Sequence, residues 1–162
     1  MVSVKGFTLL ELLIALAIVA ALLTIAAPNF RGLLVELRLR DQAARLVSAV
    51  WLARTRALRG QQVMTLCPST GLGCTKINPT GYAVVDNAGQ TLRYFSNRQG
   101  IGIYNRNGSA PQLSAVRWNT QGLADRNLTL LLCAEGSSDH WAVVLNRIGR
   151  PRIAHSWGQC PH

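Results

Sequence analysis

Near the C-terminal end of this 162-residue chain, three arginines fall within six residues: Arg147, Arg150 and Arg152. A guanidinium group is planar, stays charged at physiological pH and matches the oxygens of a phosphate. Gly149 permits a positive φ, and Pro151 favours an extended backbone at the residue before it. We therefore expect a short, locally stiff segment that presents its arginines outward and suits phosphate contacts.

The charge of the whole chain agrees with that chemistry. Lysine and arginine total 17 against seven acidic residues, which gives a formal net charge of +10. Such a chain favours polyanionic partners: nucleic acid, lipopolysaccharide or anionic lipid. The alternative is that scattered arginines only keep the protein soluble, and charge alone does not decide between the two.

Signatures of catalysis are missing from the sequence. Ser138, Asp139 and His140 are adjacent, but neighbours in sequence do not make a catalytic triad without an arranged nucleophile and base. The chain has no HExxH motif, no P-loop and no complete glycine fingerprint. An enzyme is therefore the least expected class, and neither a cofactor nor a metal is predicted.

An apolar run of membrane-spanning length, residues 6–28, begins close to the N-terminus. It carries a single acidic residue, Glu11, and a charge at the centre of a membrane helix costs about 2.5–3.5 kcal/mol. A secretory signal peptide has a shorter apolar core and no acid near its start. A plain membrane anchor fits the length but gives no reason for Glu11.

The residues around the start of this run, Lys5–Glu11 (KGFTLLE), resemble the processing site of type IV pilins and type II secretion pseudopilins. The resemblance implies that prepilin peptidase cleaves between Gly6 and Phe7 and that the new Phe7 amine is methylated. Glu11 would then be the fifth residue of the mature chain, the position that the family uses for assembly. Pro28 also matches a proline of the family.

This family pattern divides the chain into a leader (1–6), a transmembrane and assembly helix (7–28), an amphipathic second half of the helix (29–60) and a β-rich periplasmic domain (61–162). The protein is expected to cross the bacterial inner membrane once and then to join other pilins in a filament, the tip being one option. There Glu11 would pair with the Phe7 amine of a neighbouring subunit, because an unpaired buried charge is costly. The alternative is that Glu11 only reaches the lipid headgroups.

Beyond Pro28 the sequence stays helical to about Arg59, with Gly60 as a plausible stop. Two i,i+4 pairs, Glu36–Arg40 and Asp41–Arg45, would support the helix. Its apolar residues recur every three or four positions and form one stripe: Leu39, Ala43, Leu46, Val50, Ala53 and Ala57. The second half of the helix is therefore expected to pack on another layer.

Short β-favouring runs separated by turn signals fill the rest of the chain. They are Gln62–Cys67, Tyr82–Asp86, Thr91–Phe95, Gly100–Asn105, Ala115–Asn119, Leu128–Cys133 and Trp141–Asn146, with Ile153-Ala154 as a last short strand. The two most apolar runs, LTLLLC and WAVVLN, are expected at the centre of a sheet. The predicted class is α+β, a long N-terminal helix packed on an antiparallel β-rich domain. This order resembles the type IV pilin fold, in particular the GspH/FimT group of minor pilins.

Four cysteines, Cys67, Cys74, Cys133 and Cys160, lie in the part that the resemblance places outside the cytoplasm. An even number in an oxidising compartment indicates two disulfides, and three pairings are possible. We favour Cys67–Cys74, which closes a loop rich in Gly, Pro and Ser, and Cys133–Cys160, which ties the tail to a core strand. The rival is a zinc site with Cys160 and His162, although no CxxC pair is present.

The C-terminal Gly-Arg-x-Arg segment resembles that of FimT-type minor pilins. The resemblance implies that Arg147, Gly149, Arg150 and Arg152 bind the phosphate backbone of DNA, without reading its sequence, for uptake in natural transformation. Two alternatives remain: a structural, FimU-like minor pilin that primes pilus assembly, and a GspH-like pseudopilin of type II secretion. In either, the arginines would belong to a solvated hairpin loop.

Several aromatic and basic side chains fit more than one role. Trp157 and His155 would either stack on bases of single strands or cover a sheet edge beside a disulfide, and the second role is the commoner one. Five further arginines would extend a basic surface if they share its face: Arg93, Arg98, Arg106, Arg117 and Arg126. Three tryptophans are expected in the core or in a groove: Trp51, Trp118 and Trp141.

Overall fold

The computed structural model describes residues 6, 8–111, 114–135, 137 and 139–161, without the side chains of 25–29 and 31. The expectations for Phe7, the leader residues 1–5, the ring of Pro28 and His162 therefore fall outside the described part. Contacts divide the chain into two compact units, Met1–Val35 and Glu36–His162.

The first unit contains the start of helix α1 (Leu9–Gly60). Thr8 and Glu11 form a capping box there: the Glu11 amide donates to Thr8 Oγ1 at 3.2 Å, and the Thr8 amide donates to Glu11 Oε2 at 3.3 Å. All described side chains from Thr8 to Thr24 are exposed, including Leu9 at 77%. No helix within the described residues combines the length and the apolar character that a membrane span requires.

The second unit begins with the other half of α1, whose predicted apolar stripe is confirmed. All six residues of the stripe are at most 1% exposed. The helix ends at Gly60, as predicted. The predicted pair Asp41–Arg45 forms at 2.9 Å, whereas no ion pair joins Glu36 to Arg40 among the described side chains.

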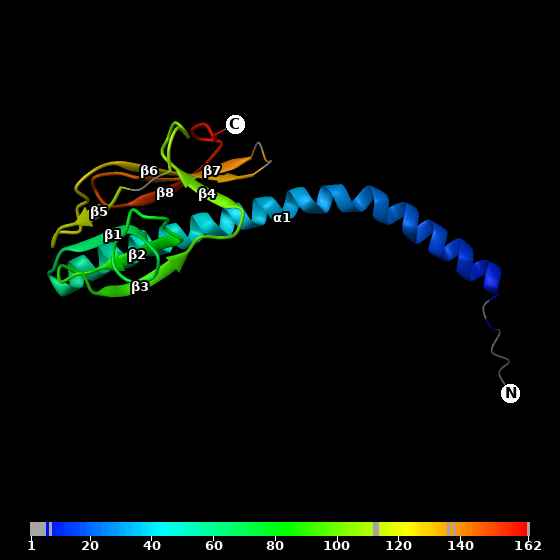
Figure 1. The fold of residues 1–162 in the computed structure, drawn as a ribbon, viewed down its shortest axis with the longest axis horizontal. Helices are drawn as coiled ribbons and strands as arrows, with labels where there is room; N and C mark the ends of the chain where they lie inside the picture. The colour runs from blue at the N-terminus through cyan, green and yellow to red at the C-terminus, as the bar shows by residue number, and fades with distance from the viewer. Residues whose placement is uncertain (1–5, 7, 112–113, 136, 138, 162) are drawn as a thin grey trace. The chain divides into compact units, whose positions relative to one another are not determined.

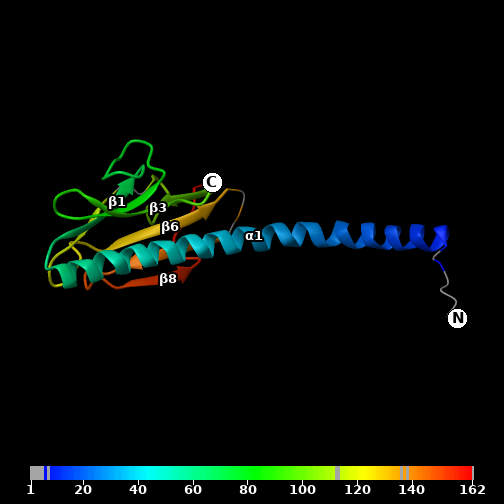
Figure 2. The same ribbon diagram turned by 90° about the horizontal axis from the view of Figure 1, so that it is seen from below.

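Two four-stranded antiparallel sheets lie against this half of the helix (Figures 1 and 2). The first has the order β3-β2-β1-β5, from β1 (Met64–Ser69), β2 (Gly81–Val85), β3 (Thr91–Ser96) and β5 (Val116–Trp118). The second has the order β4-β6-β7-β8, from β4 (Ile101–Tyr104), β6 (Leu128–Ala134), β7 (His140–Leu145) and β8 (Pro151–His155). The α+β class is confirmed, and β6 and β7 are central in their sheet, as predicted.

Residues of the second sheet alternate between its two faces. One face carries side chains that are at most 2% exposed, among them Leu130, Leu132 and Val143. The opposite face carries a separate cluster of Leu131, Cys133 and Ala142, and Cys160 from the C-terminal tail packs against it. The tail therefore covers the second face of this sheet.

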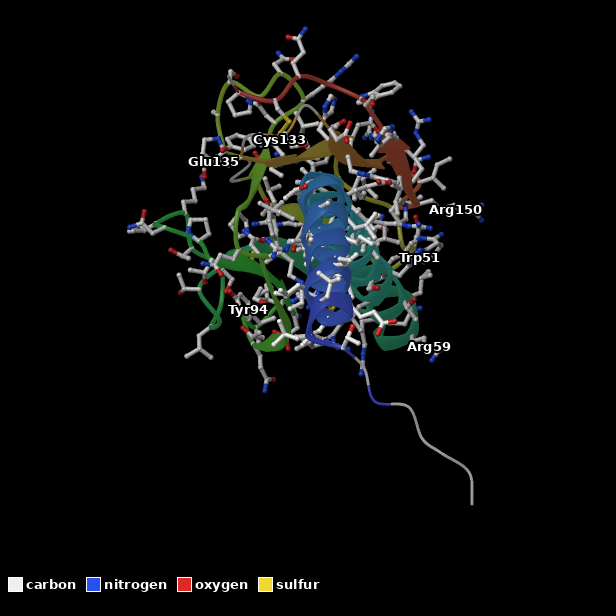
Figure 3. All side chains as sticks on the ribbon, turned by 90° about the vertical axis from the view of Figure 1, so that its right-hand side faces the viewer. Trp51, Arg59, Tyr94, Cys133, Glu135 and Arg150 are labelled. Carbon is white, nitrogen blue, oxygen red and sulfur yellow. A yellow bond between two sulfur atoms is a disulfide. The ribbon has the colours of Figure 1, made fainter. Side chains whose placement is uncertain are left out.

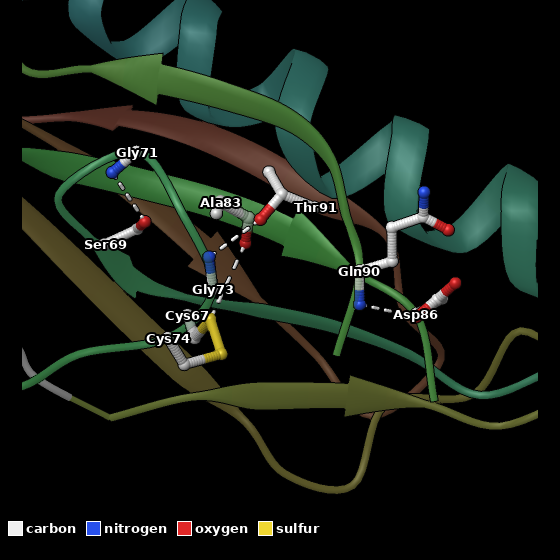
Figure 4. The surroundings of a disulfide bond; sticks show 9 residues. All are labelled: Cys67, Ser69, Gly71, Gly73, Cys74, Ala83, Asp86, Gln90 and Thr91. Carbon is white, nitrogen blue, oxygen red and sulfur yellow. Dashed lines mark hydrogen bonds between the residues drawn. A yellow bond between two sulfur atoms is a disulfide. The ribbon is translucent and has the colours of Figure 1, made fainter. Parts of the chain in front are cut away.

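Both favoured disulfides are present, Cys67–Cys74 and Cys133–Cys160, with Cα–Cα distances of 5.5 and 5.8 Å. In the loop that the first one closes, the Gly73 amide donates to Thr91 Oγ1 at 2.8 Å (Figure 4). The zinc alternative is wrong, because Cys160 is in a disulfide and offers no thiolate.

Candidate functional site

The predicted site residues lie at the turn of the β7–β8 hairpin. The Gly149 amide donates to the Asn146 carbonyl oxygen at 2.9 Å, and the Arg150 amide donates to Asn146 Oδ1 at 3.2 Å. Gly149 has a φ of 79°, a positive value of the kind that a glycine permits. Asn146 therefore closes the turn with its main chain and its side chain, and the turn places Arg147 just before Gly149 and Arg150 just after it.

Gly149 is buried, and its neighbours leave no room for a side chain. A Cβ at this position would meet the carbonyl oxygen of Gly122 and would lie 2.9 Å from the indole nitrogen of Trp118. The same Gly122 oxygen accepts from Nε of Arg54 on α1 at 3.2 Å. The absence of a side chain at Gly149 therefore lets the turn pack on the loop after β5.

Main-chain hydrogen bonds of Arg147 fasten the turn to the same loop. Its amide donates to Asn127 Oδ1 at 2.9 Å, and its carbonyl oxygen accepts from the Ala124 amide at 3.0 Å. The side chain of Arg147 is exposed, as is that of Arg150. In Figure 3, Arg150 points outward from the side of the unit that also carries Trp51 and Arg59 of α1.

Arg152 lies on β8, the edge strand of its sheet, where it pairs with Val144. Since Val144 packs with the cluster under the tail, Arg152 belongs to the tail-covered face. Its guanidinium carbon lies 5.0 Å from the centre of the Trp157 ring. Trp157 thus borders the cluster instead of merely covering a sheet edge.

Within the described part of the chain, the three guanidinium groups of the cluster form no ion pair with a carboxylate. The ion pairs among the described residues involve Arg45, Arg98 and Arg126, and none involves Arg147, Arg150 or Arg152. Exposed guanidinium groups of this kind are able to bind an anion. No group of His, Cys, Asp or Glu side chains in the described part of the chain is arranged to hold a metal.

The remaining arginines divide by their neighbours. Arg98 and Arg126 are paired with carboxylates, and Arg93 stacks on Phe95 in the other sheet at 5.2 Å. Arg106 lies near Trp157, which Arg152 also approaches, since the guanidinium carbon of Arg106 is 5.4 Å from the Trp157 ring centre. Trp51 was expected in the core or a groove; it is 42% exposed and is therefore not a core residue.

Sequence reasoning found the arginines but missed their supports. Both supports lie about twenty residues or more before the turn. The side-chain oxygen of Asn127 accepts a hydrogen bond from the Arg147 amide, and the backbone of Gly122 lies close to Gly149. A local signal was available for Asn146, since an asparagine three residues before a glycine is typical of a hairpin turn that ends in a left-handed residue. No comparable signal marks the partnership of Trp157 with Arg106.

Comparisons with known proteins agree with this architecture. The family model of the type II transport protein GspH matches residues 42–149, and that of the prokaryotic N-terminal methylation motif matches residues 1–27. Two crystal structures of the type IV minor pilin FimU of Pseudomonas aeruginosa (strain PAO1), in space groups P21 and P65, are similar to the chain, with TM-scores of 0.54 and 0.55 and 16% identity. Both cover 72% of this chain, and 87% and 92% of their own. Since the identity is low, the likeness shows the fold alone. No curated protein matches the chain.

Proposed function

This chain belongs to the GspH family of minor pilins and pseudopilins, and from that premise we propose that it binds DNA through the end of its β7–β8 hairpin. The family consists of structural proteins and not of enzymes, and the methylation motif indicates a membrane-anchored pilus component. In the proposal, prepilin peptidase cleaves after Gly6 and methylates Phe7. The mature chain then crosses the inner membrane once, exposes its β-rich unit to the periplasm and assembles into a pilus for natural transformation.

The observation that carries the proposal is the exposure, near one end of one hairpin, of three arginines that form no ion pair with any residue that the structure describes: Arg147, Arg150 and Arg152. Contacts of arginine with phosphate oxygens are independent of base sequence. They release counterions from DNA, so affinity falls as salt rises. Three such contacts predict a slope of about −2.7 for log affinity against log salt on duplex DNA.

Binding by one subunit is expected to be weak, because three exposed contacts supply little free energy. Several copies in one filament would act together, since binding by one copy raises the effective DNA concentration for the next. Weak, sequence-independent binding also suits a protein that must bind any DNA fragment and release it again.

The test is a titration of fluorescent duplex DNA with the full chain in detergent micelles, at salt concentrations from about 50 to 200 mM. The Arg147/Arg150/Arg152→Gln variant is expected to lose most of the affinity and most of the salt dependence. The matched control is Arg38/Arg40/Arg93→Gln, which removes the same charge from exposed positions on α1 and β3. Equal binding by the wild type and the first variant would remove the hairpin from the mechanism.

A structural role in pilus assembly or in type II secretion is the second candidate. The GspH match favours it because that match ends at residue 149, before Arg150 and Arg152. Complementation of cells that lack the protein separates the two. If DNA binding is the function, the Arg147/Arg150/Arg152→Gln variant restores pilus assembly but not DNA uptake; under the structural alternative it restores both.

A further inference from the structure

Trp157 has an arginine beside it from each of two distant segments. The guanidinium carbon of Arg152 on β8 lies 5.0 Å from its ring centre, and that of Arg106, in the turn after β4, lies 5.4 Å from it. The indole is 37% exposed, and both arginines are exposed as well. Arg106 and Arg152 thus form a second group of cations, held around Trp157. Arg152 also belongs to the first group, with Arg147 and Arg150.

The main chain of the tail holds this arrangement in place. The Gln159 amide donates to the Arg106 carbonyl oxygen at 3.4 Å. Gly158 approaches the same oxygen so closely that a Cβ there would lie 2.7 Å from it. Cys160, which follows directly, is bonded to Cys133 of the central strand β6. The contacts of the three residues that follow Trp157 therefore fix its position relative to Arg106.

Two cations next to one ring repel each other unless something offsets their charge. Neither Arg106 nor Arg152 takes part in an ion pair among the described residues. The negative face of the indole ring supplies part of the compensation. The remaining positive charge faces solvent, which suits an anion that carries more than one charge, such as two neighbouring phosphates of a nucleic acid strand.

We propose that Arg106 is a fourth DNA-contact residue and that Trp157 is a positioning residue that keeps Arg106 and Arg152 together for neighbouring phosphates. This inference rests on the proposed function and extends the DNA-binding surface from the β7–β8 turn along β8 to the turn after β4. Because two guanidinium groups already lie against the ring of Trp157, the ring orders cations and does not stack on a base. The contacts stay with the phosphate backbone.

The test uses the same DNA titration with the full chain. Four contacts predict a salt slope of about −3.6, and Arg106→Gln is expected to bring it to about −2.7, a change of one contact. Trp157→Leu is expected to weaken binding about two- to five-fold at constant salt, the size of an exposed cation–π contact. Trp157→Phe should restore most of that loss, because phenylalanine keeps an aromatic face.

Two controls test whether the effect is specific to Trp157 and its two arginines. Arg93→Gln removes an exposed arginine that stacks on Phe95 in the other sheet, and Trp51→Leu removes an exposed tryptophan that lies 5.6 Å from the guanidinium of Arg54. Both controls are expected to bind DNA as the wild type does. Circular dichroism and thermal unfolding of each variant confirm that its fold is intact.

The outcomes separate this inference from the proposed function. If Arg106→Gln and Trp157→Leu bind DNA with wild-type slope and affinity while the Arg147/Arg150/Arg152→Gln variant does not, the inference is wrong and the proposed function stands. A loss of binding to anionic lipid vesicles without a loss of binding to DNA in Arg106→Gln would also overturn it. If no variant changes DNA binding, both the proposed function and the inference fail.

Discussion

At the scale of single residues, Gly149 is the position where backbone conformation and packing coincide. Its φ is 79°, and a Cβ would meet the Gly122 carbonyl oxygen. We expect Gly149→Ala to lower the free energy of unfolding by about 2–5 kcal/mol, because a left-handed alanine costs about 1–2 kcal/mol and overpacking about 1–3 kcal/mol more. Urea denaturation followed by tryptophan fluorescence measures this.

Gly89 provides the matched control for that prediction. Its φ is 81°, but a Cβ there would have nothing within 4 Å. Gly89→Ala should therefore show only the cost of the left-handed backbone, about 1–2 kcal/mol. If both variants lower the free energy of unfolding equally, the close approach of the hairpin turn to Gly122 does not contribute to stability.

The same glycine shows what a sequence reveals about single residues. Its position between two arginines and before Arg150-Pro151 predicted the turn and permitted a positive φ, because those properties are local. Its contact with Gly122 could not be predicted, because that contact depends on how two loops of different sheets meet. The exposure of Trp51 is a different case, since the helical spacing already places it outside the predicted apolar stripe.

At the scale of elements, Asp41 ties α1 to the loop between β3 and β4. Its carboxylate accepts from Nε of Arg98 at 2.6 Å and from Nε of Arg45 at 2.9 Å. Beside it, the buried Gln42 accepts from the Arg98 amide at 2.9 Å. The hydrogen bond from Arg98 and then that from Arg45 hold the pKa of Asp41 below its ordinary value of 3.8.

The sign of the resulting pH dependence follows from that direction. A carboxyl whose pKa is lower in the folded state stabilises the fold at pH values above 3.8, and this contribution disappears as the pH falls through the folded-state pKa. We expect Asp41→Asn to lower the free energy of unfolding by about 1 kcal/mol or less at neutral pH, because the carboxylate is partly exposed. The deficit should shrink as the pH falls below 3.8 and vanish once the pH is below the folded-state pKa of Asp41, where both proteins carry a neutral group.

Asp139→Asn is the control for this measurement. Asp139 is exposed and forms no ion pair among the described residues, so the substitution should change stability at neither pH. A deficit of Asp41→Asn that persists unchanged in acid would show that packing, and not the charge, is responsible.

The elements themselves were predictable, whereas their pairing was not. Each strand lies within two residues of a predicted run, because alternation and turn residues are local signals. The division into two sheets was not predicted, because it depends on strands that are not consecutive in the sequence. β1 pairs with β5, although three strands lie between them in the sequence, and β4 pairs with β6 and not with β3. The packing face of the long helix was easier to predict, since its apolar stripe comprises six regularly spaced residues, all of which are buried.

At the scale of the whole molecule, Glu11 combines an observed contact in the helix with a proposed role in the filament. Its carboxylate completes the capping box with Thr8, a contact worth about 1 kcal/mol. A charge left unpaired in an apolar filament or membrane costs about 2.5–3.5 kcal/mol, which exceeds the value of the cap. We therefore expect the charge, paired with the Phe7 amine of a neighbouring subunit, to decide assembly.

Glutamine separates these roles, because it can complete a capping box but carries no charge. Glu11→Gln and Glu11→Ala are both expected to be processed and inserted, yet to be missing from sheared pili on immunoblots. If Glu11→Gln enters pili as the wild type does and only Glu11→Ala is excluded, the capping box is what matters. The register of the filament would then have to be set by the exposed apolar side chains that follow Glu11, from Leu12 to Leu23, whose packing distinguishes subunit positions less sharply than one buried ion pair.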